Sequence, residues 1–189
     1  MKNLRLALFA MVAVVQLAVP AGMITRWQYA LIHGEPFKFL TAPVDPYDAF
    51  RGRYVALRLE AEAVDIPTNA EFKTHAVVYG TVAVGTNGFA YLTDLSTTKP
   101  DAPCIRGRIR YVDGNKAHVN LPVDRLYMNE KLAPEAERAY QQNSLRTNQV
   151  AYATVRVRGS DAVIEDLFID DIPIHDFLQQ AKYPLRVAE

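Results

Sequence analysis

The longest apolar stretch of the chain lies near its N-terminus, where residues 6–24 are almost uninterruptedly hydrophobic. This length approaches the ~20 residues that a helix needs to cross a bilayer, and it exceeds the ~7–15 residues typical of a cleaved signal peptide core. Arg26, Trp27 and Tyr29 follow directly, and such side chains favour the membrane–water interface. The pattern therefore predicts a signal anchor over residues 1–34, whose transmembrane helix ends at a glycine cap.

A cleaved signal peptide is the alternative interpretation of the same segment. Residues 19–21, Val-Pro-Ala, offer small side chains near a plausible cleavage site at Ala21, although the proline weakens that site. Lys2 and Arg5 precede the apolar stretch and favour a cytoplasmic N-terminus. The remainder of the chain is then expected to lie outside the cytoplasm.

A second pattern, with a period of two, begins at Tyr54. Alternate residues form an apolar set, and the residues between them form a mostly polar set. The apolar set is Val55, Leu57, Leu59, Ala61 and Ala63, and the other set is Tyr54, Ala56, Arg58, Glu60 and Glu62. This alternation predicts one half-buried β-strand.

Three hairpins are predicted further along, each around a turn rich in Gly, Asn, Asp or Ser. They cover residues 72–95, 104–121 and 148–169, with turns at 85–88, 113–115 and 159–161. Short helices are expected over 133–143 and within 172–183, whereas residues 122–132 are expected to be irregular. The fold class is therefore mainly β: an N-terminal transmembrane helix, then an antiparallel β-sandwich or open barrel over residues 35–189 with one or two short helices.

Composition gives no support to a nucleic-acid partner or to an intramolecular disulfide. Basic and acidic residues balance at 21 each among 189 residues, so the charge does not favour a nucleic-acid partner. Cys104 is the single cysteine, so no intramolecular disulfide can form. We expect a small structural thiol at this position.

The segment around the second pattern also carries a family resemblance. Residues 52–59, Gly-Arg-Tyr-Val-Ala-Leu-Arg-Leu, and the preceding Asp-Pro-Tyr-Asp at 45–48 resemble the motif of the GDYxxLxY family of bacterial membrane-anchored proteins. Two positions depart from the motif, since Arg53 replaces its Asp and Leu59 its final Tyr. The resemblance implies a single-pass protein of the bacterial inner membrane with a periplasmic domain, and an accessory role beside another membrane protein.

The motif and its lead-in form the first candidate site. Its residues are Asp45, Asp48, Arg51, Gly52, Arg53, Tyr54 and Leu57. A polar loop held by a rigid scaffold is a common setting for partner or ligand binding. The alternative is a structural turn that Asp48 and Arg51 pin and Gly52 permits.

Three arginines form the second candidate site. Arg106, Arg108 and Arg110 alternate along one predicted strand, about 6–7 Å apart on one face. Lys116, His118 and Asn120 share that face on the return strand, and Arg156 and Arg158 repeat the spacing later. The face suits an anionic ligand or lipid head group. The alternative is a solvated face with cross-strand ion pairs to acids such as Glu60, Glu62, Glu165 and Asp166.

Catalytic chemistry finds little support in the residues. The four histidines, His33, His75, His118 and His175, lack metal-ligand spacing, so neither a metal nor a cofactor is expected. Ser96, Ser144 and Ser160 sit in ordinary turn contexts without a nucleophile motif. We therefore expect a non-enzymatic, membrane-anchored accessory domain that partners an integral membrane protein. An anion-binding domain and an unrecognised membrane-anchored hydrolase are the alternatives.

Overall fold

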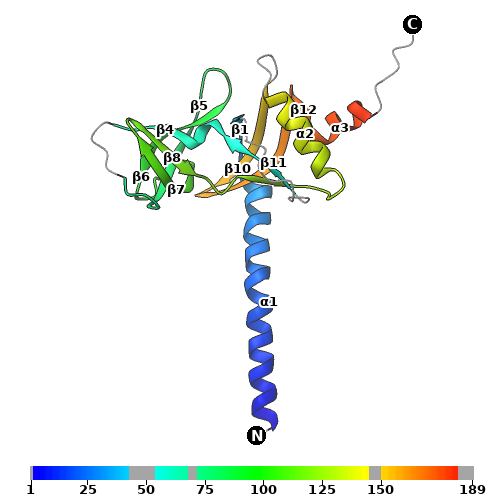
Figure 1. Cartoon of the computed structure of the whole chain (residues 1–189). Helices are drawn as coiled ribbons and strands as arrows, with labels where there is room; N and C mark the ends of the chain where they lie inside the picture. The colour runs from blue at the N-terminus through cyan, green and yellow to red at the C-terminus, as the bar shows by residue number, and fades with distance from the viewer. Residues whose placement is uncertain (1, 43–53, 68–71, 145–149, 183–189) are drawn as a thin grey trace.

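A long helix and a β-rich domain make up the molecule (Figure 1). The computed structural model describes residues 2–42, 54–67, 72–144 and 150–182. Helix α1 (Lys2–His33) projects from one side of the domain and, from Leu8 to His33, is long and apolar enough to cross a membrane. Its extent agrees with the predicted N-terminal helix, and Pro20 is accommodated within it.

The elements after α1 are strands interrupted by short helices. They are β1 (Glu35–Ala42), β2 (Tyr54–Ala56), β3 (Arg58–Leu59), the 3-10 turn η1 (Glu60–Glu62), β4 (Ala63–Asp65), β5 (Val77–Val84), β6 (Ala90–Ser96), β7 (Cys104–Asp113), β8 (Lys116–Asn120), β9 (Arg125–Tyr127), α2 (Ala133–Ser144), β10 (Ala151–Arg158), β11 (Asp161–Ile169), β12 (Ile172–Pro173) and α3 (Ile174–Lys182).

Within the described residues, the strands form two five-stranded antiparallel sheets and one small ribbon. We call the first, in the order β12-β11-β10-β1-β3, the anchor sheet because β1 follows α1 directly. The second, in the order β4-β8-β7-β5-β6, is the distal sheet, and β2 pairs with β9 as the ribbon. This architecture confirms the prediction of a mainly β fold built as an antiparallel sandwich or open barrel. Neither large sheet closes on itself.

The three predicted hairpins are confirmed as β5–β6, β7–β8 and β10–β11. Their turns use Gly88, Gly114 and Gly159 at positive φ, where an L side chain would be strained. Local turn chemistry therefore specifies these pairings. The predicted helices are confirmed as α2 and α3.

The prediction of one continuous strand from Tyr54 to Ala63 is wrong. The segment contributes β2 to the ribbon, β3 to the anchor sheet and β4 to the distal sheet, with η1 in between. Burial alternates as predicted up to Ala61, but the tight turn then shifts the parity by one residue. Glu62 is therefore buried and Ala63 exposed, the reverse of the prediction.

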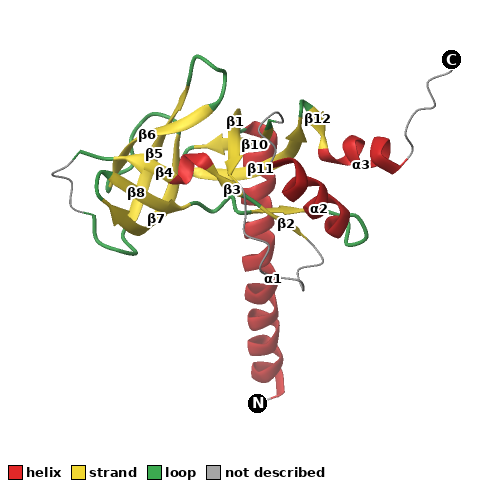
Figure 2. Ribbon diagram, turned by 45° about the horizontal axis from the view of Figure 1, so that its top comes forward, coloured by secondary structure: helices red, strands yellow, loops and turns green. Residues whose placement is uncertain are grey.

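The prediction that residues 122–132 are irregular is wrong, because strand β9 lies within them. The strand is three residues long and pairs with β2, which lies far away in sequence. Figure 2 shows α2 and α3 on the opposite side of α1 from the distal sheet. A single core joins the sheets, and its largest fully buried side chains include Phe39, Leu59, Ile105 and Tyr140.

Candidate functional site

The family-like motif lies only partly within the described residues. Asp45, Asp48, Arg51, Gly52 and Arg53 fall in residues 43–53, outside the described part of the chain. The later motif residues, from Tyr54 onward, are described and can be placed.

Tyr54 lies in an aromatic and cationic cluster on the β2–β9 ribbon. It pairs in register with Tyr127, and the two rings meet edge to face at 5.7 Å between centroids. The Arg125 guanidinium lies over the Tyr54 ring, 5.0 Å from its centroid. A hydrogen bond with Tyr127 raises the pKa of Arg125 above its ordinary value. Tyr127 is 70% exposed, so the cluster presents an aromatic surface to the outside. We call Tyr54, Arg125 and Tyr127 the ribbon cluster.

Leu57, the other described motif residue, is a core residue. It is buried, and its backbone N–H donates to the carbonyl oxygen of Asp124 at 2.9 Å. This bond continues the ribbon pairing one residue past β2. Leu57 therefore positions the ribbon cluster and does not itself present a binding surface.

The last two turns of α1 are fastened to the anchor sheet. Arg26 forms an ion pair with Asp161, at the start of β11, and the Arg158 guanidinium lies over the Tyr29 ring at 4.1 Å. Ala30 is buried at this contact. These contacts join the helix to the domain in one defined orientation.

Gly34 permits the close approach at which α1 ends. Its N–H donates to the carbonyl oxygen of Ala30 at 2.8 Å, and α1 ends directly before it, as predicted. Its own carbonyl oxygen accepts a hydrogen bond from Arg156 Nη1 at 3.2 Å. A Cβ at this position would collide with the Ala30 oxygen and lie 3.0 Å from the Arg156 Cβ. Only glycine therefore fits without a shift of backbone.

A groove opens where α1 meets the ribbon. It measures about 620 Å³, and three segments line it: Trp27 and Leu31 of α1, residues 122–127 with β9, and residues 162–165 of β11. We call it the junction groove. Sequence reasoning did not find it, because its three walls are distant along the chain and one of them, β9, was not predicted.

Glu62 is a buried carboxylate beside the motif segment. Burial raises its pKa, against the opposing effects of the Leu59 backbone N–H and of the Arg58 and Arg110 charges. The Arg58 Nε lies 3.8 Å from a carboxylate oxygen of Glu62. The sequence pattern assigned this residue to the exposed face, so no signal in the pattern pointed to its burial.

The arginine face is built much as the sequence suggested, with one irregularity. Arg106 and Arg108 are exposed on the distal sheet, and Arg108 pairs with Asn120. Arg110 falls at a β-bulge between Ile109 and Tyr111, where its charge acts on Glu62. Among the described residues, no acid forms an ion pair with Arg106, Arg108 or Arg110. On the anchor sheet, by contrast, Arg156 pairs with Glu165 at 2.8 Å, as the alternative interpretation expected.

The thiol of Cys104 is buried and not activated. Burial raises its pKa above the usual value, and its S–H donates to the Gly159 carbonyl oxygen at 3.3 Å. A nucleophilic cysteine requires the opposite shift. Within the described part of the chain, no three His, Cys, Asp or Glu side chains are grouped as metal ligands.

Comparisons with known proteins give one match. A family model described as "GDYXXLXY protein" matches residues 16–167, which run from the second half of α1 through most of β11. Neither the curated proteins nor the solved structures contain a match to the chain.

Proposed function

This chain belongs to the GDYXXLXY family, and from that premise we propose that it is a membrane-anchored accessory protein whose β-rich domain binds another membrane protein. The proposal places α1 across the bacterial inner membrane as a single pass, with the domain on the periplasmic side. It assigns no catalytic step to the domain.

One observation carries the proposal: the ribbon cluster and the junction groove lie beside the helix, not at the far end of the domain. Most of the exposed large apolar side chains of the described residues lie on α1. Tyr127 adds an aromatic surface near the end of α1 that meets the domain. Contiguous exposed apolar surface commonly marks an interaction site. A partner in the same membrane has direct access to this surface.

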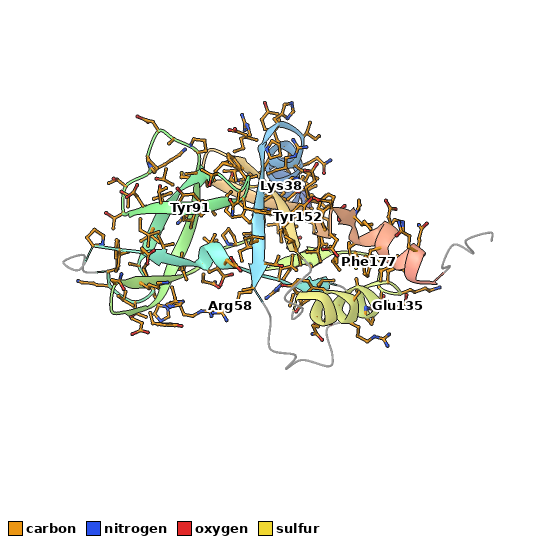
Figure 3. The ribbon with its side chains drawn as sticks, turned by 90° about the horizontal axis from the view of Figure 1, so that it is seen from above. Lys38, Arg58, Tyr91, Glu135, Tyr152 and Phe177 are labelled. Carbon is orange, nitrogen blue, oxygen red and sulfur yellow. The ribbon has the colours of Figure 1, made fainter. Side chains whose placement is uncertain are left out.

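The experiment is a mild-detergent pull-down of the tagged full-length protein beside its Tyr127→Ala variant. Tyr127 is largely exposed, so its truncation should leave the fold intact and remove an aromatic anchor of the kind that dominates interfaces. We expect recovery of the partner to fall at least tenfold. Tyr91→Ala is the matched control, since Tyr91 is also an exposed tyrosine but lies on the distal sheet (Figure 3).

A second pair of variants tests the motif itself, namely Tyr54→Ala and Arg51→Ala. A folded variant that loses the partner would make the motif an interaction site. Co-isolation of no integral membrane protein with the wild type would overturn the proposed function. Equal recovery of the partner by the wild type and all the variants would instead show that the ribbon cluster does not bind the partner.

Anion binding by the distal sheet is the second candidate function. It is favoured by the exposed Arg106 and Arg108, which lack ion-pair partners among the described acids. Vesicles of anionic lipid should then retain the domain at low salt and release it at high salt. Replacement of Arg106, Arg108 and Arg110 by Gln should abolish the retention, and unchanged retention would exclude this function.

A further inference from the structure

The position of the junction groove along α1 limits what can reach it. About 20 residues, from Leu6 to Thr25, suffice to cross a hydrocarbon core of about 30 Å. If they do so in the proposed orientation, Trp27 lies at head-group level and Leu31 one turn higher. The groove then opens directly above the bilayer, and its natural occupant rises out of the membrane beside α1.

The wall that α1 contributes continues down the helix as one face. Trp27 and Leu31 are four residues apart, and Ile24, Leu17 and Ala13 extend the same face at spacings of three, seven and four. Trp27, Ile24 and Leu17 are exposed, so this face is open to a neighbour. Spacings of this kind match the contact seam of two packed helices.

The lining of the groove favours an apolar occupant. Val123, Leu126 and Ala162 are buried in its floor, and Val163 and Ile164 are half-buried. This is the environment that an apolar side chain requires.

The charges at the rim of the groove are paired with one another. Arg125 faces Asp124 at 3.6 Å, and Glu165 is held by Arg156. Among the residues that the structure describes, the groove therefore offers no unpaired cation to a lipid phosphate. A peptide segment with apolar side chains suits it better than an anionic head group.

We propose that the junction groove receives the membrane-proximal end of a transmembrane helix of the partner protein, which packs along the Leu17–Ile24–Leu31 face of α1. This inference rests on the proposed function and adds the location and the secondary structure of the contact. The ribbon cluster, at the β9 end of the groove, borders the same helix.

Photo-cross-linking in native membranes tests the proposal with the full-length protein. The photoreactive amino acid p-benzoylphenylalanine replaces Leu31 or Val163, which line the groove, in separate variants. Matched controls carry it at Ile32, on a neighbouring face of α1, and at Val84, on the distal sheet; both are more than half exposed. We expect adducts from the groove positions at least tenfold above those from the controls. Mass spectrometry should place the attachment site at the end of a membrane-spanning helix of another protein.

A further variant, Val163→Glu, places a charge in the groove at a half-buried position. It should reduce the adduct from position 31 at least tenfold, with circular dichroism and the thermal midpoint confirming that the domain remains folded. Should the variant not fold, Val163→Thr, of similar size and greater polarity, should weaken the same adduct.

Adducts with lipid alone, with a second copy of this chain, or with a soluble segment of the partner would each overturn the proposal. If the pull-down recovers a membrane protein but the groove positions do not react with it, the function stands and the groove assignment is wrong. If neither experiment finds a partner, the proposed function itself fails.

Discussion

Arg26 of α1 and Asp161 of β11, 135 positions apart in the sequence, form a two-point ion pair. Arg26 Nε donates to one carboxylate oxygen at 2.7 Å, and Nη2 donates to the other. A bidentate arginine–carboxylate pair fixes direction as well as distance. The contact therefore helps to fix the angle at which the helix leaves the domain, together with the Arg158–Tyr29 and Gly34–Arg156 contacts.

Asp161→Ala should loosen the helix much more than it destabilises the domain. The Arg26 side chain is 65% exposed, so solvent screens the pair and it should contribute little to the free energy of unfolding. Trp27 is the single tryptophan of the chain, so its fluorescence anisotropy reports the junction directly. We expect lower anisotropy in Asp161→Ala and unchanged anisotropy in Asp113→Ala, an exposed acid on the distal sheet. The swapped pair Arg26→Asp with Asp161→Arg should restore part of the signal, and no change in any variant would contradict this role.

Gly34→Ala should destabilise the junction. The added Cβ meets the Ala30 carbonyl oxygen and the Arg156 Cβ, so backbone must shift, at a cost of ~1–3 kcal/mol. Gly22→Ala is the matched control in α1, because nothing lies within 4 Å of its Cβ position, and alanine favours a helix. Thermal unfolding in detergent micelles should show a lower midpoint for Gly34→Ala and an equal or higher one for Gly22→Ala. Equal midpoints in both variants would show that the close approach is not required.

The buried carboxylate of Glu62 should make stability fall as pH rises. Burial raises its pKa from an ordinary value of 4.5, so above pH 4.5 the folded state holds a proton that the unfolded state releases. Stability is then greatest below this pH and decreases through the raised pKa. In Glu62→Gln, denaturant unfolding should show a flatter pH dependence, so that the variant gains stability relative to wild type from pH 4.5 to pH 7. Glu60→Gln, the exposed neighbour, should follow the wild type. A parallel loss in Glu62→Gln would assign the pH dependence to other groups.

Features set by short-range chemistry could be predicted from the sequence. The hairpin turns follow from Gly88, Gly114 and Gly159, which adopt positive φ, and the end of α1 follows from Gly34. The long helix α1 follows from the mostly apolar composition of its segment. Each of these signals lies within a few residues of the feature that it specifies.

Features set by long-range contacts could not be predicted. Alternation through residues 54–63 is equally consistent with one long strand, and only the three separate partners of this segment reveal the turn at η1. Strand β9 is too short to carry a pattern of its own. The junction groove depends on both, and on the Arg26–Asp161 pair. The face of Arg106 and Arg108 was predictable because it needs only one strand and its hairpin neighbour.

The hydrogen bond between Tyr152 and Asp171 and the strained backbone of Asp171 act at the same turn. The Tyr152 hydroxyl donates to Asp171 Oδ1 at 2.8 Å, and Asp171 holds a left-handed backbone with φ of 62°. Asp171→Asn keeps an acceptor and tolerates this φ, whereas Asp171→Ala removes the acceptor and strains the turn, for a loss of about 2 kcal/mol in the free energy of unfolding.

Burial is the main cause that raises the pKa of Tyr152 from 10.0 to about 12, and the hydrogen bond to Asp171 is the second. Between these values the unfolded state loses the proton first, so stability should fall as pH rises from 10 to 12. In Tyr152→Phe this fall should be shallower, while Tyr91→Phe, at an exposed tyrosine, should behave like the wild type in the same urea titration. Identical slopes for Tyr152→Phe and wild type would show that Tyr152 does not carry this pH dependence.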